Sequence, residues 1–302
     1  MKKIAVTGLS GVVGQIVKKT ASQEDMLIDL FHRSPCSNHD TQGKIIHKHI
    51  DLLSKESTER TLSSIEPDVI IHMAAMTHID TCEKDKTYGK DGIVWKTNVE
   101  GTRNIVSYCA KNSVPIVYLS TECVFDGKKN SYREHDKKNP RNWYGRTKHE
   151  AEDIVLSSGV PASVIRGVIA YHDKDNQNTI FGKFVSLLKK KNEIFVVGDQ
   201  KFTPTYTYDI SKAIGNTVRG HIHGVFHVSP DISLSPYEFV TLLATQYNLD
   251  VSRVRKTTLV SFFGKTRASL RLPHACLSQT YSNIKLSIMP KKPIDAFNVM
   301  TI

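Results

Sequence analysis

Lys3-Ile-Ala-Val-Thr7 runs directly into Gly8-Leu-Ser-Gly11-Val-Val-Gly14 near the start of this 302-residue chain. The first run is typical of a buried strand, and a helical pattern follows the glycines over 12–21. Small residues let the backbone approach a pyrophosphate, and a helix N-terminus supplies N–H groups and a positive dipole end. This order predicts a dinucleotide-binding turn, although a tight turn without a ligand would use the same residues. The candidate cofactor residues here are Gly8, Ser10, Gly11, Val12, Val13 and Gly14.

Strand-like and helix-like segments alternate along the first half of the chain. Apolar runs typical of strands lie at 27–32, 45–50, 68–75, 115–120 and 162–166, and helical patterns at 54–65, 92–112 and around 144–148. This alternation predicts βαβ units, and therefore a Rossmann-type, doubly wound parallel sheet of the α/β class. We expect a dinucleotide-binding domain over 1–168, to which 205–228 returns, and a smaller C-terminal, mainly substrate-binding lobe over 169–302.

The second half is less regular. The sequence predicts a helix over 181–191 and short strands at 194–197 and 225–228. Ser235-Pro-Tyr-Glu238 places Ser at an N-cap, Pro at the first helical position and Glu three residues after the cap, which predicts a capping box.

The composition is that of an ordinary globular protein, with 39% hydrophobic residues. No apolar run approaches the ~18–20 residues needed to span a bilayer, so we expect no membrane partner. The five cysteines are scattered without a C-x-x-C, which favours reduced thiols and a cytoplasmic location. The histidines lack a recognisable set of accompanying ligands, so no metal is predicted.

The net charge of +11 is unevenly distributed. From Val251 onward there are nine Lys or Arg residues and one acid, Asp295, so +8 lies in the last 52 residues. A basic segment suits an anionic ligand such as a diphosphate, and would also suit nucleic acid or an acidic membrane. A solvated basic face without any partner is an equally good interpretation, and we do not expect nucleic acid.

The end of the second predicted strand bears on the type of cofactor. An acid there would hold a ribose 2′-hydroxyl, whereas an Arg would accommodate a 2′-phosphate. The run Leu30-Phe31-His32-Arg33-Ser34 has no acid after Asp29, which itself lies within the strand. Arg33 therefore favours NADP, unless it is an ordinary surface charge. Asp51 and Leu52 follow the third strand, where they could flank the adenine.

Tyr144-Gly-Arg-Thr-Lys148 places a phenol and an ammonium one helical turn apart on the same face. A nearby ammonium favours the phenolate and lowers the pKa of the Tyr, which suits proton exchange with a carbonyl/alcohol couple. Ser120-Thr121 ends the fifth strand, at the edge where such sheets bind ligands. A hydroxyl there could hydrogen-bond a substrate carbonyl oxygen, or simply cap the following loop.

Taken together, these residues resemble the extended short-chain dehydrogenases/reductases, and among them the dTDP-4-dehydrorhamnose reductases and their relatives. The resemblance covers about Lys2 to Pro273. The motifs that carry it are T-G-x-x-G-x-x-G at 7–14, His72-Met-Ala74-Ala75, Asn98-Val-Glu-Gly101-Thr102, Ser120-Thr121-Glu122-Cys123-Val124-Phe125-Asp126-Gly127, Tyr132-Arg-Glu134, Asn142-Trp-Tyr144-Gly-Arg-Thr-Lys148, Asp199-Gln200-Lys-Phe-Thr-Pro204-Thr205-Tyr-Thr-Tyr-Asp209 and Arg271-Leu-Pro273.

The resemblance implies a role for each matching residue. Thr121, Tyr144 and Lys148 match the catalytic triad of the family. Tyr144 would protonate the nascent alkoxide, Thr121 would orient the carbonyl, and Lys148 would bind the nicotinamide ribose and lower the pKa of the Tyr. Tyr144 and Lys148 are thus also cofactor residues, Ala74 and Ala75 would flank the adenosine ribose, and the substrate residues are Thr121, Glu122, Cys123 and Arg271. Glu122 and Cys123 stand where the family usually has Asp and Tyr, which leaves the exact substrate open.

The implied activity is the NADP-dependent reduction of a nucleotide-activated 4-keto-deoxysugar, as in dTDP-rhamnose biosynthesis, with NAD as a possible cofactor. A homodimer is compatible with the resemblance. One alternative is a nucleotide-sugar epimerase or dehydratase that recycles tightly bound NAD, because an acid beside the hydroxyl residue is used by dehydratases. A non-catalytic alternative is a dinucleotide-binding subunit that resembles the regulatory β-subunit of methionine adenosyltransferase. Fold alone does not decide among these activities.

Overall fold

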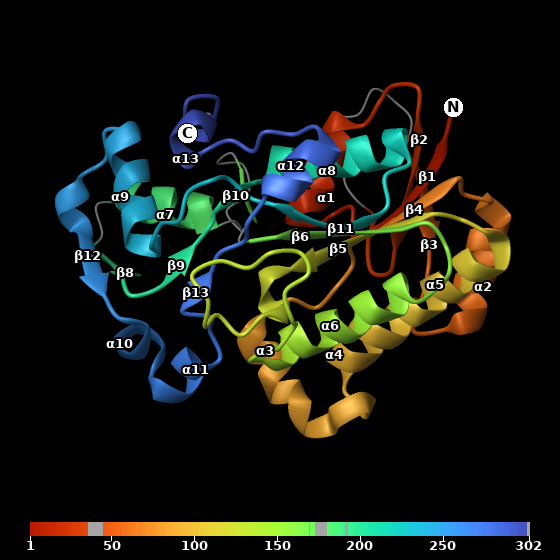
Figure 1. Cartoon of the computed structure of the whole chain (residues 1–302), viewed down its shortest axis with the longest axis horizontal. Helices are drawn as coiled ribbons and strands as arrows, with labels where there is room; N and C mark the ends of the chain where they lie inside the picture. Colours follow the sequence, from red (N-terminus) through yellow and green to blue (C-terminus); the bar gives the residue numbers. More distant parts are fainter. Residues whose placement is uncertain (36–44, 169, 173–179, 191–192, 301–302) are drawn as a thin grey trace.

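A seven-stranded, fully parallel sheet forms the centre of the computed structural model (Figure 1). The structure describes residues 1–35, 45–168, 170–172, 180–190 and 193–300. In sheet order the strands are β11 (Gly224–Val228), β6 (Ala162–Gly167), β5 (Ile116–Thr121), β4 (Val69–His72), β1 (Lys3–Thr7), β2 (Met26–Phe31) and β3 (Ile45–His49). The predicted Rossmann-type, doubly wound α/β fold is confirmed. Cys36 and Lys191, which two of the predictions above include, lie outside the described residues.

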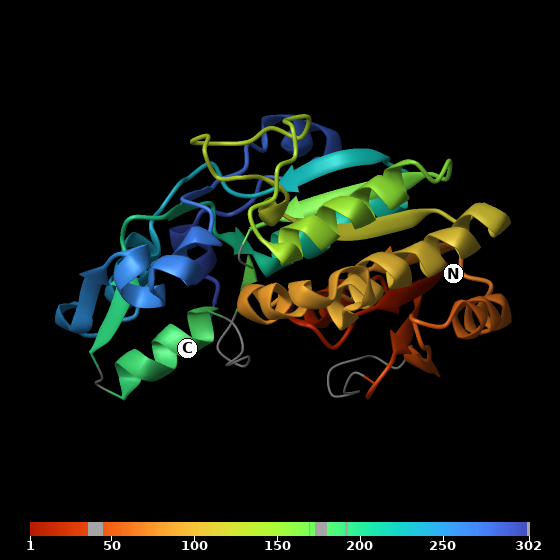
Figure 2. The same cartoon turned by 90° about the horizontal axis from the view of Figure 1, so that it is seen from below.

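Helices cover both faces of this sheet (Figures 1 and 2). Apolar side chains from both faces of the strands are buried under them, as expected for a parallel sheet. One face carries α1 (Val12–Thr20), α8 (Thr207–Gly220) and α12 (Thr280–Leu286); the other carries α2 (Lys55–Ile65), α5 (Gly101–Asn112) and α6 (Trp143–Leu156), with α3 (Ile79–Asp85) and α4 (Ile93–Trp95) near the ends of α5 and α6.

The helix predicted over 92–112 is real but not uniform. It consists of α4, a π-helical turn at Lys96–Glu100, and α5. The stripe of Trp95, Val99, Val106 and Cys109 that the 3.6-residue period indicated is buried. The π-turn adds one residue to the helix without breaking it, which a periodicity argument does not detect.

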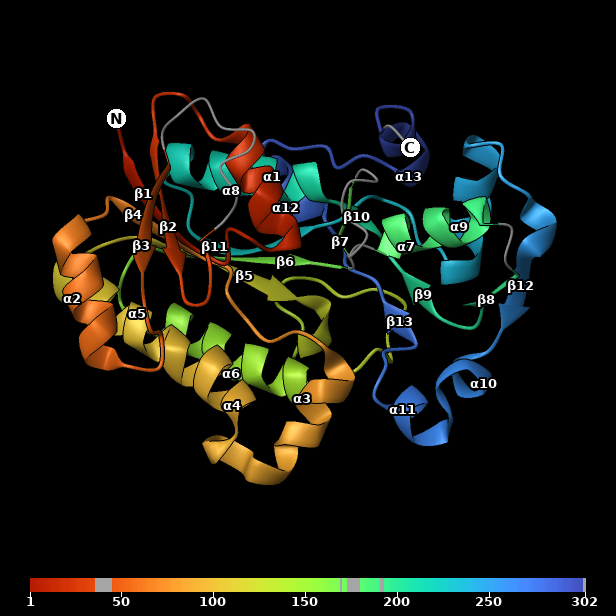
Figure 3. The same cartoon turned by 180° about the vertical axis from the view of Figure 1, so that it is seen from behind.

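A smaller C-terminal lobe lies beyond the carboxyl ends of the strands (Figure 3). Its helices and strands are mostly short: α7 (Ile180–Lys189), β8 (Ile194–Val197), β9 (Lys201–Phe202), α9 (Pro236–Gln246), β12 (Val254–Thr257), α10 (Leu259–Phe263), α11 (Lys265–Ser269), β13 (His274–Ala275) and α13 (Pro293–Phe297), with β7 (Ala170–Tyr171) pairing with β10 (Thr205–Tyr206) at the junction. The capping box of Ser235 and Glu238 at the start of α9 is confirmed.

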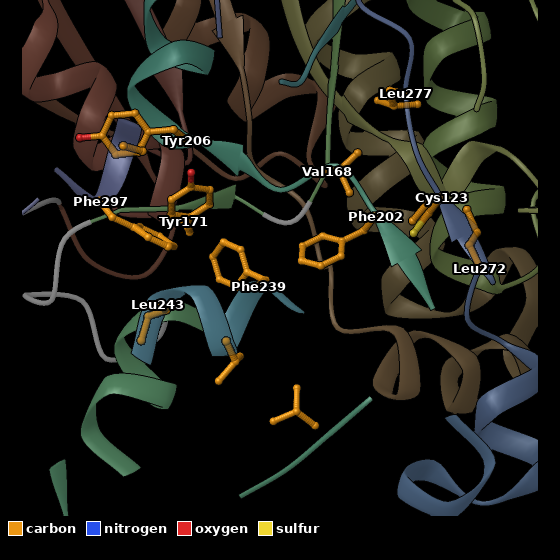
Figure 4. Packing of buried hydrophobic residues seen from close by; sticks show 14 of the residues in the cluster. Cys123, Val168, Tyr171, Phe202, Tyr206, Phe239, Leu243, Leu272, Leu277 and Phe297 are labelled. Carbon is orange, nitrogen blue, oxygen red and sulfur yellow. The ribbon is translucent and has the colours of Figure 1, made fainter. Parts of the chain in front are cut away.

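The smaller lobe and the end of β5 share one apolar cluster (Figure 4). Aromatic rings at its centre pack edge to face, among them Tyr171, Phe202, Phe239 and Phe297. Cys123 and Tyr144 belong to the same cluster. The side chains at the end of β5 are therefore held by the packing of both parts of the chain.

The C-terminal part also returns to the main sheet twice. β11 pairs with β6 and α8 packs on α1. The sequence prediction did not include the second return, in which α12 packs on β11 and α8. Asn216 of α8 donates a hydrogen bond to the Leu286 carbonyl at 2.8 Å, and the Leu286 side chain is fully buried.

A buried ion pair joins α6 to β6 behind the carboxyl edge. The guanidinium of Arg166 donates to both carboxylate oxygens of Glu152, at 2.8 and 2.7 Å, and both side chains are almost fully buried. Ser120 donates to the same carboxylate at 2.5 Å. Burial by itself raises the pKa of Glu152, but hydrogen bonds and attraction from Arg166 outweigh it and leave the pKa lowered. The pair thus fixes the strand residue next to Thr121.

Glu152→Gln should lower the free energy of unfolding by ~3–5 kcal/mol, because it leaves the Arg166 charge buried without its counter-charge. The matched control is Glu150→Gln in the same helix, whose ion pair with Arg146 is partly exposed and should contribute ~0–1 kcal/mol. Denaturant unfolding of the three proteins measures both. Equal losses in the two variants would contradict the ion-pair assignment.

Candidate active site

The glycine turn between β1 and α1 has the shape that a pyrophosphate requires. Gly8 has a φ of +77°, and a Cβ there would lie 2.8 Å from the Ala74 nitrogen. A Cβ on Gly14 would lie 2.4 Å from the Gly8 carbonyl oxygen. Gly11 is instead exposed and is the N-cap of α1, where no side chain caps the helix. Gly8 and Gly14 thus make the turn, and Gly11 leaves room for a ligand beside the first N–H groups of the helix.

The other predicted cofactor residues gather at the same edge of the sheet. Arg33 is exposed just beyond β2, while Asp29 is buried within β2, with one carboxylate oxygen 3.0 Å from His47 Nδ1. Asp51 follows β3 and accepts the Leu53 N–H at 3.0 Å. Leu52 is buried beside it, and Ala74 and Ala75 follow β4. Since β4, β2 and β3 lie around β1, these residues surround the glycine turn.

The helix α6 places Tyr144 and Lys148 on the same buried face, as the spacing predicts. Lys148 Nζ donates to the Leu119 carbonyl at 2.7 Å and lies 3.9 Å from the centre of the Tyr118 ring. Burial lowers the pKa of Lys148 to about 7. Burial also raises the pKa of Tyr144 well above its ordinary value. The expected lowering of the Tyr144 pKa by Lys148 is therefore not seen, because burial dominates and the ammonium is directed at a backbone carbonyl.

Thr121 is hydrogen-bonded to the two residues that follow it in the chain. The Thr121 hydroxyl donates to Glu122 Oε2 at 2.7 Å and accepts from the Cys123 N–H at 3.2 Å. Burial raises the pKa of Glu122, and the bond from Thr121 only partly offsets this. Three of the predicted site residues, Thr121, Glu122 and Cys123, are thus in one hydrogen-bonded group.

Gly145 lets α6 pack directly against this group, and the sequence prediction missed it. A Cβ on Gly145 would lie 2.0 Å from the Cys123 carbonyl oxygen, so the α6 backbone rests directly on the turn that follows β5. Asn142 accepts the Gly145 N–H at 2.7 Å and caps the helix. The available signal was the small residue directly after Tyr144 at the start of the helix.

The structure gives Arg271 a partner within the protein. Its Nη1 and Nη2 atoms lie 3.0 Å from the two carboxylate oxygens of Asp80, and its guanidinium lies 3.7 Å from the Phe263 ring centre. Hydrogen bonds from Arg271 and Arg267 hold the pKa of Asp80 well below its usual range. The contact joins the smaller lobe to α3, and the role of Arg271 in substrate binding stays a prediction.

None of the helices in the described part of the chain is long and apolar enough to cross a membrane. The parallel sheet, its glycine turn and the Thr121–Tyr144–Lys148 group at the carboxyl edge define an extended short-chain dehydrogenase/reductase. The model of one family in particular, described as the RmlD substrate binding domain, matches residues 1–279. The chain belongs to this family.

Several characterised proteins are similar to the chain. The spore coat polysaccharide biosynthesis protein SpsK of Bacillus subtilis is 29% identical, over 85% of this chain and 84% of that protein. The methionine adenosyltransferase 2 subunit beta of Bos taurus is 27% identical, over 85% and 75%. The dTDP-4-dehydrorhamnose reductase of Sinorhizobium fredii is 28% identical, over 75% and 72%. The crystal structure of the Bacillus anthracis dTDP-4-dehydrorhamnose reductase, in complex with NADP, has the same fold, with a TM-score of 0.82, 22% identity and 98% and 97% of the chains covered.

Gly145→Ala adds a single methyl group, which should displace α6 and lower the rate of turnover. The new Cβ cannot fit against the Cys123 carbonyl, so α6 must move away from Thr121, and a shift of about 1 Å in such a group costs ~10²-fold in rate. Turnover and thermal unfolding of the purified variant measure the effect. The control is Gly215→Ala in α8, whose Cβ would meet only the mobile end of Arg219. A fully active Gly145→Ala protein would contradict the importance of this contact.

Proposed function

We propose that the protein is an NADP-dependent reductase that acts on the keto group of a nucleotide-activated 4-keto-deoxysugar. The observation that carries this proposal is that α6 holds Tyr144 and Lys148 on one buried face and rests on the turn that follows Thr121, at the same sheet edge as the glycine turn. A phenol and a hydroxyl at this edge suit a carbonyl oxygen that becomes an alkoxide. The similarity to the dTDP-4-dehydrorhamnose reductase of Sinorhizobium fredii supports a nucleotide-activated deoxysugar as the class of substrate.

The residues fit the cofactor. Exposed Gly11 and the first turn of α1 would hold the pyrophosphate, and Ala74 and Ala75 would lie beside the adenosine ribose. Arg33 would pair with a 2′-phosphate. The acid that could instead hold a ribose 2′-hydroxyl, Asp29, is buried within β2 and bonded to His47. When bound, NADPH supplies the hydride. The NADP complex of the Bacillus anthracis reductase, whose fold this chain shares, supports the same cofactor.

The protein's own groups would handle the proton. Thr121 would orient the keto oxygen toward Tyr144, and the Tyr144 phenol would give its proton to the alkoxide as it forms. Because the Tyr144 pKa is raised, the phenol carries its proton at neutral pH and can act as the acid. Lys148 would bind the nicotinamide ribose, and its ammonium would stabilise the phenolate left after the transfer.

A binding role without catalysis is the second candidate. It rests on the similarity to the methionine adenosyltransferase β-subunit, which has about the same identity as the reductase. The two proposals differ in one measurable quantity, the net oxidation of added NADPH. The most direct assay is a screen of nucleotide-activated keto-sugars with NADPH, followed at the nicotinamide absorbance. Steady consumption of NADPH supports the reductase, whereas no consumption with any sugar, together with tight dinucleotide binding, supports the regulatory role. An epimerase or dehydratase would convert the sugar without consuming NADPH.

Arg33→Ala should weaken NADPH binding by roughly 10–100-fold and leave NADH binding nearly unchanged. The reason is that a charge-assisted bond to the 2′-phosphate contributes ~1.5–3 kcal/mol. Fluorescence titration of both dinucleotides checks this, with Arg60→Ala on the exposed surface of α2 as the control. Equal affinity of the unsubstituted protein for NADPH and NADH would contradict the pairing of Arg33 with the 2′-phosphate.

Tyr144→Phe should lower kcat by ~10²–10⁴-fold while dinucleotide binding stays close to that of the unsubstituted protein, because the ring still packs and only the acid is lost. Stopped-flow or steady-state kinetics with NADPH, combined with a binding titration, separates the two effects. Tyr88→Phe, at a largely exposed position, is the control. A Tyr144→Phe protein with full activity would refute the proposed acid.

A further inference from the structure

Asn142 contacts two parts of the molecule at once. It is the N-cap of α6 and is buried, with 3% of the residue exposed. Its Oδ1 atom accepts the Gly145 N–H at 2.7 Å, and its Nδ2 atom donates to the Leu270 carbonyl of the smaller lobe at 2.9 Å. A carbonyl can only accept and an N–H can only donate, so these two partners fix the orientation of the amide. One side chain therefore joins the start of α6 to the segment that follows α11.

Capping the helix does not by itself require an asparagine. Serine and aspartate cap helices about as well, because the cap needs only an acceptor oxygen. The amide adds a donor on a second atom. An ionised aspartate has no donor, and serine has a single oxygen that would have to serve both partners. The bond from Asn142 to the Leu270 carbonyl is thus the part of the contact that helix capping does not explain.

The segment 269–272 is also held from other sides. Within the smaller lobe, Gln200 Nε2 donates to the Leu272 carbonyl at 2.7 Å. The Leu272 side chain is buried in the apolar cluster that the lobe shares with the end of β5 (Figure 4). Arg271 binds Asp80 of α3 through both of its terminal nitrogens, at 3.0 Å each. The position of this segment therefore depends on how the smaller lobe is seated against the rest of the chain.

Tyr144 stands in the first turn of the helix that Asn142 caps. The same turn contains Gly145, whose backbone rests on the Cys123 carbonyl with no room for a Cβ. The planar amide of Asn142 fixes the spacing between its two partners. A displacement of Leu270 would therefore be passed through this amide to the closely packed turn that carries Tyr144.

We propose that Asn142 is a positioning residue that couples the seating of the smaller lobe to the placement of Tyr144. With the lobe in place, the Leu270 carbonyl holds the amide, and the amide holds the first turn of α6 beside the end of β5. Asn142 acts only through the helix and takes no part in the chemistry itself. The effect on turnover rests on the proposed reductase function, whereas the mechanical coupling does not.

Two substitutions separate the coupling from the cap. Asn142→Ser and Asn142→Asp keep an acceptor for the helix but remove the separate donor to Leu270. Both should lower kcat, Asn142→Ser by ~10-fold and Asn142→Asp by up to ~10²-fold, because a carboxylate also repels the carbonyl and small displacements of a catalytic group are costly. NADPH binding should stay close to that of the unsubstituted protein. Kinetics with NADPH and a nucleotide-activated 4-keto-6-deoxysugar, with a binding titration, measure both quantities.

The matched control is Asn216→Asp. It removes a bond of the same kind, from a side-chain amide to the Leu286 carbonyl, but between α8 and α12. Its kcat should be that of the unsubstituted protein.

Hydrogen exchange measures the coupling without any turnover. Asp80→Asn loosens the segment from its other side, because it weakens the hold on Arg271. With Asn142 present, this should speed exchange of the Gly145 N–H several-fold. In a protein that also carries Asn142→Ser, Asp80→Asn should leave the exchange rate unchanged, because the link is already broken. Asp250→Asn, which breaks an ion pair inside the lobe, is the control and should have no effect in either protein.

A lower kcat in both Asn142 variants, with exchange that responds to Asp80→Asn only when Asn142 is present, supports the coupling. Unchanged kcat in both variants would reduce Asn142 to a helix cap and overturn the proposal. The proposal also fails if Asp80→Asn changes the exchange equally with and without the amide. If the unsubstituted protein oxidises no NADPH with any keto-sugar, the reductase function fails, and the exchange measurement alone decides whether Asn142 couples the lobe to the helix.

Discussion

The contact between Gly145 and the Cys123 carbonyl sets the geometry on which the site depends. It lets the backbone of α6 rest on the turn after β5, with no side chain between them. This close approach holds Tyr144 beside the turn that follows Thr121 and places Lys148 over the Tyr118 ring of β5. One turn further along α6, Glu152 binds Arg166 and Ser120. The helix and the strand are therefore fixed to one another by a close backbone contact in front and a buried ion pair behind.

The same burial that orders these groups also controls their proton affinities. It raises the pKa values of Tyr144 and Glu122 and lowers that of Lys148 to about 7. All three shifts favour neutral forms in a region of low dielectric. A site that holds its groups neutral is suited to move protons between them, whereas a permanently charged site would hold substrate without exchanging protons. This is the physical reason to make Tyr144 the proton donor of the proposed reaction rather than Lys148.

Local patterns were sufficient to predict most of the fold. The glycine turn, the apolar strands and the cap at Ser235 depend on residues close in sequence, and each lies close to where the pattern indicated, although β4 ends at His72 and not at Ala75. The ion pair between Asp80 and Arg271 joins residues 191 positions apart, and no periodicity could have paired them. The direction of the Lys148 ammonium is another case. Spacing places Lys148 on the face of Tyr144, but the side-chain conformation and the nearby Leu119 carbonyl decide where its charge goes.

The proposed function requires net transfer of a hydride from the nicotinamide to the keto carbon of the sugar. NADPH labelled with deuterium on the transferred face of its ring, incubated with the protein and a nucleotide-activated 4-keto-6-deoxysugar, tests this claim directly. We expect the deuterium to appear on the former keto carbon of the alcohol product, with one label for each NADPH consumed, as measured by NMR and mass spectrometry. Label that remains on the nicotinamide while the sugar is epimerised or dehydrated, or the absence of any product, would contradict it.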